Sequence, residues 1–374
     1  MDFPNRHSCA KVVPMSQLRR IWIGFPLCVG AVAFSLPAAP QVEPDQNQPV
    51  LEQPLDQPSA EAAGFQSYLQ LVAAKARGQG VSQQAIDSVL GGLTYNPRVV
   101  ALDRNQPGAS PGTPPSFWAY YDRHIGSARI ASGRSALADN LGLIHQVEAQ
   151  YGVPGAMIMA IWGKETFYGR VKGDFDLARS LATLAYEGRR RDLFEGELIA
   201  LIKMIDRGVP RSRMLGSWAG AFGNPQFLPS VYLRVARDGD GDGDADIWND
   251  RADTFASIAN YFRDAGWRPG EPWGVKATVA PEFERRGLAT RLQSPACPRV
   301  HVRHSVWKTV GEWRELGVVP LAPIDEATQA TLFEPDGPGK GAFLLTGNYR
   351  VILHYNCSNY YALSVGLLAD EIAR

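Results

Sequence analysis

The sequence predicts an α+β fold, in which a mainly helical body carries a small strand-containing insertion before its final helix. Three observations support this prediction. Residues 116–262 show apolar residues at helical spacing, punctuated by Gly and Pro. The pattern then changes, because Val275, Ala277 and Val279 alternate as in a strand. The chain closes with an apolar helical segment, Tyr360–Ile372. Helices and strands that are kept apart along the chain are typical of α+β architecture.

The N-terminus has the pattern of an export signal. Arg19-Arg20 precede an apolar run from Ile21 to Leu36, and Pro and Ala residues follow. The run is short for a membrane span. The alternatives are an uncleaved anchor or a start codon assigned too far upstream. We expect a signal peptide over residues 1–39, a periplasmic protein, and membrane association only through this segment.

Two segments without regular structure flank the first predicted helices. Residues 40–62 are rich in Pro and Gln and predict a flexible linker. Folded sequence is expected from about Phe65, and Ser82 is a candidate N-cap for a helix that ends at Leu90. Residues 105–115 contain many Pro and Gly residues and predict an extended loop.

The helical body and the insertion follow. The predicted helices of the body are Ser135–Tyr151, Pro154–Phe167, Ser180–Tyr186, Asp192–Arg207 and Ala252–Ala265. Ala342–Leu345 and Tyr349–Leu353 predict two strands joined by a turn at Thr346-Gly347-Asn348. We therefore expect one folded region over 63–374, with the helical body at about 116–270 and 355–374 and the β-containing subdomain at about 275–354.

Composition excludes several functional classes. The chain has 374 residues, of which 45% are hydrophobic and 20% charged, as in ordinary globular proteins. Its formal net charge is zero, so no global basic field would attract nucleic acid. No glycine-rich phosphate loop or zinc spacing occurs, and we expect no organic cofactor and no nucleic-acid partner. A monomer is expected.

Glu165 is the candidate catalytic residue. It follows the apolar run Met157–Trp162, and aromatic residues and glycines come directly after it. Apolar surroundings disfavour the charged form of a carboxyl group and raise its pKa. A carboxylic acid that stays protonated near neutral pH can donate a proton to a leaving group. A glycosidase normally needs two such carboxyl groups, and no second one is evident.

The segment Gly216–Pro229 contains four glycines and two prolines, which break any regular helix. Ser217 and Gln226 supply hydrogen-bonding groups on a backbone that a ligand can approach closely. The alternative interpretation is a tight connection between helices with no role in binding.

An acidic loop predicts a calcium site. Asp238, Asp240 and Asp242 occupy positions 1, 3 and 5 of an EF-hand-like loop, and glycine occupies position 6. Asp244 at position 7 would bind through its backbone carbonyl. The loop lacks the usual closing Glu, so Asp253 at the start of the next helix is the candidate closing ligand. The alternative is a solvated acidic loop without metal.

Two further features lie near the C-terminus. Asn356 and Tyr361 belong to a Tyr- and Asn-rich junction before the last helix, where such side chains can project into a groove. A helix cap with core tyrosines is the alternative. Cys297 and Cys357 are the only cysteines after the signal, and exported proteins often pair such residues. Two buried free thiols are the alternative.

Taken together, these motifs resemble those of the membrane-bound lytic transglycosylase B family of bacterial murein-degrading enzymes. The resemblance runs from about Ser116 to Ile372. Four blocks carry it in the family's order and spacing: Glu165–Gly169, Gly216–Pro229, Asp238–Trp248 and Tyr355-Asn356 with Tyr360-Tyr361.

The resemblance implies a lysozyme-like fold and cleavage of the MurNAc–GlcNAc β-1,4 bond of peptidoglycan glycan strands. The product would carry a 1,6-anhydromuramyl end. Glu165 would be the single acid and base, with the substrate's own C6 hydroxyl as nucleophile. The implied sugar contacts are Ser217, Gln226, Tyr261, Asn356 and Tyr361. The implied structural calcium ligands are Asp238, Asp240, Asp242 and Asp253.

One departure and two alternatives accompany the resemblance. Residues 188–193 lack a tyrosine that some relatives use in the groove, so we predict no sugar contact there. A lysozyme-type hydrolase would share the substrate but give a hydrolysed product. A non-catalytic glycan-binding protein of the envelope would not need Glu165, Ser217 and Gln226 intact.

Overall fold

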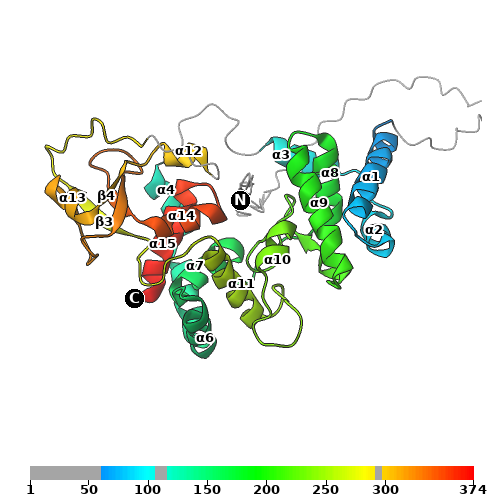
Figure 1. The fold of residues 1–374 in the computed structure, drawn as a ribbon, viewed down its shortest axis with the longest axis horizontal. Helices are drawn as coiled ribbons and strands as arrows, with labels where there is room; N and C mark the ends of the chain where they lie inside the picture. Colours follow the sequence, from blue (N-terminus) through cyan, green and yellow to red (C-terminus); the bar gives the residue numbers. More distant parts are fainter. Residues whose placement is uncertain (1–59, 106–115, 291–296) are drawn as a thin grey trace, which may run out of the picture.

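The computed structural model describes residues 60–105, 116–290 and 297–374. The predicted signal peptide, nearly all of the predicted linker and most of the predicted loop at 105–115 lie outside these residues. Within them, the protein is mainly helical with a small sheet at one end (Figure 1). The α+β prediction is confirmed. No helix in the described ranges combines the length and the apolar character that crossing a bilayer requires.

The helices before the acidic loop are α1 (Ala60–Gly78), α2 (Gln83–Leu90), α3 (Pro97–Arg104), α4 (Phe117–His124), α5 (Ser127–Asp139), α6 (Leu141–Tyr151), α7 (Gly155–Thr166), α8 (Leu177–Glu187), α9 (Arg191–Asp206), the 3-10 helix η1 (Arg211–Arg213) and α10 (Pro229–Val235). Those after it are α11 (Arg251–Asp264), α12 (Pro298–His301), α13 (Val310–Glu315), α14 (Gly347–Tyr355) and α15 (Asn359–Ala373). The strands are β1 (Phe175–Asp176), β2 (Leu215–Gly216), β3 (Gly274–Val279), β4 (Trp307–Thr309), β5 (Val318–Pro320), β6 (Gln329–Phe333) and β7 (Ala342–Leu345).

Most predicted helices are present, with ends that differ by a few residues. Ser82 is the N-cap of α2, as predicted, and its side chain accepts a hydrogen bond from the Ala85 amide at 3.2 Å. The predicted single helix Ser135–Tyr151 is wrong, because the helix is interrupted at Asn140, which separates α5 from α6. The Asn140 side-chain amide donates to the Ala136 carbonyl at 2.6 Å, a local bond that competes with continued helix.

The predicted strand Tyr349–Leu353 is also wrong, because these residues belong to α14. Thr346 caps this helix, with its side chain accepting a hydrogen bond from the Asn348 amide. Tyr349 and the apolar residues after it are buried without alternation. A short apolar run of this kind fits a buried strand and a buried helix equally well.

The insertion is a five-stranded antiparallel sheet in the order β4-β6-β7-β3-β5. Successive side chains of a strand point to opposite faces, so each face of β7 packs on a different core. Ala342 and Leu344 join a small core built around Trp313 of α13. Phe343 and Leu345 join the large core of the helical body. The sheet is therefore fixed to the body through one face.

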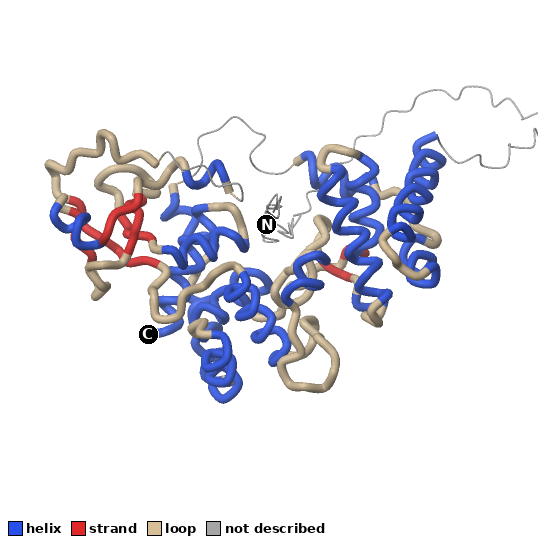
Figure 2. The backbone as a smooth tube through the Cα atoms, viewed as in Figure 1, coloured by secondary structure: helices blue, strands red, loops and turns tan. Residues whose placement is uncertain are grey.

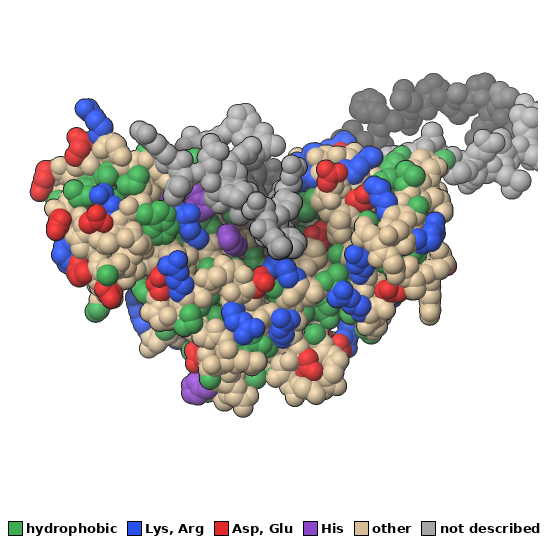
Figure 3. All heavy atoms as spheres, viewed as in Figure 1, with side chains coloured by type: hydrophobic (Ala, Val, Ile, Leu, Met, Phe, Trp, Pro, Cys, Tyr) green, Lys and Arg blue, Asp and Glu red, His purple; other side chains and the backbone are tan. Residues whose placement is uncertain are grey.

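The five-stranded sheet lies at one end of the molecule, next to α14 and α15, whereas the short pair of strands lies nearer the middle, inward of α1 and α2 (Figure 1 and Figure 2). In this pair, β1 contacts α8. Over the viewed face, basic and acidic side chains are interspersed (Figure 3). This distribution agrees with the zero net charge of the chain.

Candidate active site

Glu165 lies in the last turn of α7, the most enclosed helix of the body. Every residue from Met157 to Lys164 is buried, so α7 is apolar on all sides and packs against α15 and α5. Phe167 and Tyr168, at φ 51° and 58°, adopt left-handed backbone and end the helix. The chain therefore turns away directly after Glu165.

The Glu165 carboxyl group has one neutral partner and two cationic neighbours. Tyr361, in the first turn of α15, donates its hydroxyl hydrogen to Glu165 Oε1. Burial raises the pKa of Glu165 to about 7, although the Tyr361 hydrogen bond and then the charges of Lys164 and Arg129 lower it. This direction agrees with the raised pKa that the apolar run predicts, and the Glu165 side chain is half-buried.

Aromatic rings from three parts of the chain pack together beside this carboxyl group. The rings of Tyr261 and Tyr355 lie 4.6 Å apart between centroids, and Phe227 stacks on Tyr261 at 5.8 Å. The Tyr355 hydroxyl donates to the Pro225 carbonyl at 2.5 Å, and that of Tyr261 to a carbonyl of α14 at 2.7 Å. Tyr261 thus lies in the aromatic cluster, but its hydroxyl group is already occupied.

The loop 216–229 is held in a bent form that leaves polar atoms available. The Ser217 hydroxyl accepts a hydrogen bond from the Ala221 amide at 2.9 Å, so its own hydrogen can still be donated. Gln226 has left-handed backbone at φ 52°, and its side-chain amide donates to the carbonyls of Lys172 and Gly223. Its Oε1 has no partner among the described residues and can accept a hydrogen bond.

Asn224 connects this loop to the helix that carries Glu165. Its Oδ1 accepts from Trp162 Nε1 at 3.0 Å, and its backbone carbonyl accepts from the Thr166 hydroxyl at 3.2 Å. Its Nδ2 donates to the Trp248 carbonyl and to Thr254. Sequence reasoning missed Asn224, because an asparagine within a glycine-rich loop carries no spacing signal of its own.

The junction before α15 brings Tyr361 into contact with Glu165, whereas Asn356 does not bond to Glu165. Asn356 is buried at the C-cap of α14, and among the described residues no hydrogen bond links its side chain to Glu165.

Cys297 and Cys357 form a disulfide, which decides between the two alternatives for these cysteines. It ties this junction to the N-terminus of α12.

Besides Asn224, three residues of the site were missed in the sequence. Lys164 is buried beside Glu165, and its Nζ donates to the Tyr120 hydroxyl at 3.1 Å. Arg129 of α5 lies over the ring of Phe167, 5.1 Å from its centroid. Lys164 stood in the motif, but nothing in its spacing shows burial. Tyr120 and Arg129 are distant in sequence and carried no signal.

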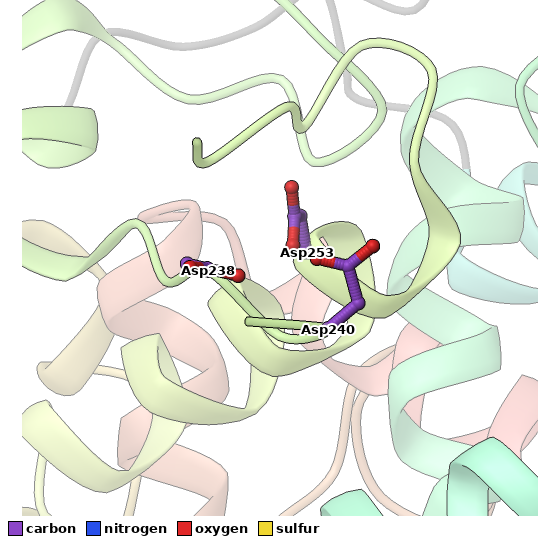
Figure 4. Close-up of side chains that lie close together, drawn as sticks. All are labelled: Asp238, Asp240 and Asp253. Carbon is purple, nitrogen blue, oxygen red and sulfur yellow. The ribbon is translucent and has the colours of Figure 1, made fainter. Parts of the chain in front are cut away.

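The acidic loop brings three of the five predicted metal ligands together. Ligand oxygens of Asp238, Asp240 and Asp253 lie within 4.8 Å of one another. Figure 4 shows the Asp253 carboxylate, from α11, beside the loop that carries the other two. Both Asp253 oxygens accept backbone hydrogen bonds, from Gly239 at 2.7 Å and Asp246 at 2.6 Å. Burial raises the pKa of Asp253 to about 6. A cluster of oxygen donors of this kind suits a hard cation such as Ca²⁺.

The side chains of Asp242 and Asp244 lie outside this group of three. The Asp244 carboxylate pairs with Arg213 at 2.6 Å, so only its backbone carbonyl could serve as a metal ligand. Asp242 Oδ1 accepts a hydrogen bond from the Asp244 amide at 2.8 Å. The structure therefore groups the first, third and closing positions of the predicted loop.

Several known proteins are similar to this chain in sequence and in fold. Residues 64–370 match the family model of the transglycosylase SLT domain. The membrane-bound lytic murein transglycosylase B of Escherichia coli is 29% identical over 302 residues, which cover 79% of each protein. SltB3 of Pseudomonas aeruginosa, solved in complex with NAG-anhNAM-pentapeptide, is 37% identical with a TM-score of 0.74, over 83% of this chain and 79% of that one.

A further solved structure is also similar and was determined with calcium. The Escherichia coli lytic transglycosylase Slt35, in complex with calcium, is 28% identical with a TM-score of 0.67. The similarity covers 84% of this chain and 94% of that one. With a family match over most of its length, this chain belongs to the transglycosylase SLT-domain family.

Proposed function

We propose that this chain is a lytic murein transglycosylase that cleaves the MurNAc–GlcNAc β-1,4 bond of peptidoglycan and forms a 1,6-anhydro-MurNAc end. The observation that carries the proposal is the solitary Glu165 carboxyl group. Among the described residues, the charged groups that act on it are the cations Lys164 and Arg129, and no second carboxylate does. The complex of SltB3 with NAG-anhNAM-pentapeptide supports the same product class.

Glu165 acts first as an acid. With a pKa of about 7, a large fraction of this group is protonated at neutral pH. Its proton goes to the glycosidic oxygen as the bond from that oxygen to C1 of the muramyl residue breaks. The ionised Glu165 that results keeps the hydrogen bond from Tyr361.

Glu165 acts next as a base. The C6 hydroxyl of the same muramyl residue attacks C1, and Glu165 takes the proton that this hydroxyl group loses. One C–O bond is broken and one is formed, and the proton returns to Glu165. The nucleophile is already attached to the reacting sugar, so positioning replaces a second protein carboxylate.

The loop and the aromatic cluster position the sugar. Gln226 Oε1 would accept a hydrogen bond from a sugar hydroxyl or amide group, and the Ser217 hydroxyl would donate one. Tyr261 supports Tyr355, since their rings pack and its own hydroxyl group is engaged. Asn356 is proposed as a sugar contact on the family resemblance.

The acidic loop would hold a structural calcium ion. Asp238, Asp240 and Asp253 would bind through their carboxylates, and the calcium complex of Slt35 supports this assignment. The ion would offset repulsion among the carboxylates and fix the start of α11, which carries Tyr261. No step of the reaction requires it.

The proposed location is the bacterial envelope, where peptidoglycan lies, after export through residues 1–39. A named relative, the lytic murein transglycosylase B of Escherichia coli, is described as membrane-bound. We propose that the enzyme works as a monomer on glycan strands, without nucleic acid or an organic cofactor.

Mass spectrometry of murein digested in H₂¹⁸O tests the function. Anhydromuramyl ends are lighter than reducing ends by one water and carry no ¹⁸O, because the nucleophile comes from the sugar. Reducing-end MurNAc labelled with ¹⁸O, as the sole product, would instead identify a lysozyme-type hydrolase. Absence of any cleavage, with glycan binding retained, would identify a binding protein.

A further inference from the structure

Lys164 is a buried cation that the reaction described above does not use. It directly precedes Glu165 on α7, and only 7% of its surface is exposed. Lysine is almost never buried to this degree unless its ammonium group has partners. Desolvation of an unpaired ammonium group is costly, so the surroundings must stabilise it.

Two tyrosines, from the helices α4 and α15, provide these partners. The Lys164 ammonium donates to the Tyr120 hydroxyl at 3.1 Å and lies 4.9 Å from the centroid of the same ring. It also lies 5.8 Å from the centroid of the Tyr361 ring. Cations over aromatic faces are attracted by the ring quadrupole. Among the described residues, no carboxylate forms an ion pair with this lysine.

Tyr361 connects Lys164 to the catalytic carboxyl group. Its ring lies under the ammonium group, and its hydroxyl group donates to Glu165 Oε1. The lysine therefore helps to fix the ring whose hydroxyl holds Glu165. Its positive charge also acts directly on the Glu165 carboxyl group.

We propose that Lys164 is a positioning residue for the transglycosylase reaction, which is held by Tyr120, fixes the Tyr361 ring beside Glu165 and stabilises the Glu165 carboxylate formed after proton donation. This inference rests on the proposed function. The carboxylate appears in an enclosed site, where a fixed neighbouring cation is worth more than it would be in water. When the ammonium group is charged, that charge is in place before the reaction and needs no reorganisation during it.

Other charged and titratable groups also face Lys164 and Glu165. Arg129 of α5 acts on both Lys164 and Glu165. His124 of α4 is affected by the charge of Lys164, and Tyr355 at the end of α14 by that of Glu165.

Burial, and then the charge of Arg129, lower the pKa of Lys164 to about 7, and Glu165 opposes this effect. The two neighbouring groups thus titrate in the same pH range. Loss of the Lys164 charge would raise the pKa of Glu165.

The test is the pH dependence of kcat, measured as anhydromuramyl ends released from soluble glycan strands. Lys164→Met should move the alkaline limb to higher pH by about one unit, because Glu165 then keeps its proton longer. The same lost interaction should reduce kcat at the optimum by about tenfold. KM should change little, since Lys164 is not proposed to touch the sugar.

Two matched variants accompany this test. Lys164→Arg keeps the charge and should restore the wild-type limb. Lys203→Met removes a partly buried helical lysine that does not act on Glu165, and should leave the limb and kcat unchanged. A folded Lys164→Met enzyme with the wild-type limb would overturn the inference.

Tyr120→Phe decides the question if Lys164→Met does not fold. This change removes the hydrogen-bond partner of the ammonium group but keeps the ring, so the limb should move in the same direction by a smaller amount. An unmoved limb in folded Tyr120→Phe would also overturn the inference. Wild-type protein that forms no anhydromuramyl ends would refute the proposed function itself, which is a different outcome from an unmoved limb.

Discussion

The Tyr361 hydroxyl group donates a hydrogen bond to Glu165 Oε1 and joins helices that lie far apart in the sequence. This bond favours the ionised carboxyl group, whereas burial favours the neutral one. The balance gives Glu165 a pKa of about 7, which suits a group that must donate a proton and then take one back.

Replacement of Tyr361 by Phe should raise the pKa of Glu165 further, because the hydrogen bond that stabilises the carboxylate is lost. A hydrogen bond to a charged group contributes about 1.5–3 kcal/mol, so kcat should fall roughly 10- to 100-fold. The alkaline limb of the pH–rate profile should move to higher pH. Tyr349→Phe is a matched control, because it removes another buried hydroxyl group that bonds to the Asn359 carbonyl at 3.0 Å. That control should lower stability but leave the limb in place.

Glu165→Gln should reduce the release of anhydromuramyl ends by roughly 10²–10⁴-fold, since the amide cannot exchange the proton. Binding of the same strands, measured by calorimetry, should persist. Glu197→Gln is the matched control, because Glu197 is a buried carboxyl group that bonds to Ser230 at 2.7 Å and lies outside the site. That variant should retain activity. Lysis by Glu165→Gln at the wild-type rate would contradict the assignment of the acid.

The same substitution should change stability in a pH-dependent way. The folded-state pKa of Glu165, about 7, lies above the ordinary value of 4.5, so the stability that this group contributes is present below pH 4.5 and is lost as the pH rises through 7. Glu165→Gln has no carboxyl group to ionise at this position, so its stability does not fall in this way as the pH rises. At pH 8 the variant should therefore be more stable than wild type by about 1–3 kcal/mol, and the difference should vanish near pH 4. Denaturant titrations at both pH values measure it, and an equal difference at both would contradict the raised pKa.

Local features of the sequence were sufficient to predict Glu165 as the catalytic candidate and to predict the C-terminal helix. The carboxyl group follows an unbroken apolar run, and a run that long has to be buried. The same reasoning failed at Tyr349–Leu353, because a short apolar run does not reveal its period. The capping bond of Thr346, which decides for helix, depends on a backbone geometry that only the folded chain shows.

Residues that act through tertiary contacts could not be predicted. Asn224 connects α7 with the acidic-loop region, and Lys164 is stabilised by rings from two other helices. Each is polar in a setting where polar residues usually face solvent. The sequence therefore predicts the reacting residue of the site, but not the residues that position it.

Calcium removal should lower the melting temperature, because an ion that binds only the native state stabilises that state. Asp253→Asn should abolish the calcium-dependent part of this stability, since Asp253 closes the group with Asp238 and Asp240. Asp244→Asn should retain it, because the Asp244 side chain pairs with Arg213 and its backbone carbonyl is unchanged. Thermal melts with calcium and with chelator give the comparison. Identical melting curves for wild-type protein in both conditions would count against the site.

Reduction of the Cys297–Cys357 disulfide should destabilise the fold and loosen the junction before α15. The bond closes a loop with a sequence separation of 60, for which the chain-entropy estimate is about 4 kcal/mol. Tyr361 lies four residues beyond Cys357, so the loss should also reduce activity by disturbing the donor to Glu165. Unfolding and activity are measured with and without reductant, and the double variant Cys297→Ala/Cys357→Ala is the control. Reductant should not affect this variant further, whereas a wild-type enzyme whose stability is unchanged by complete reduction would refute the structural role of the bond.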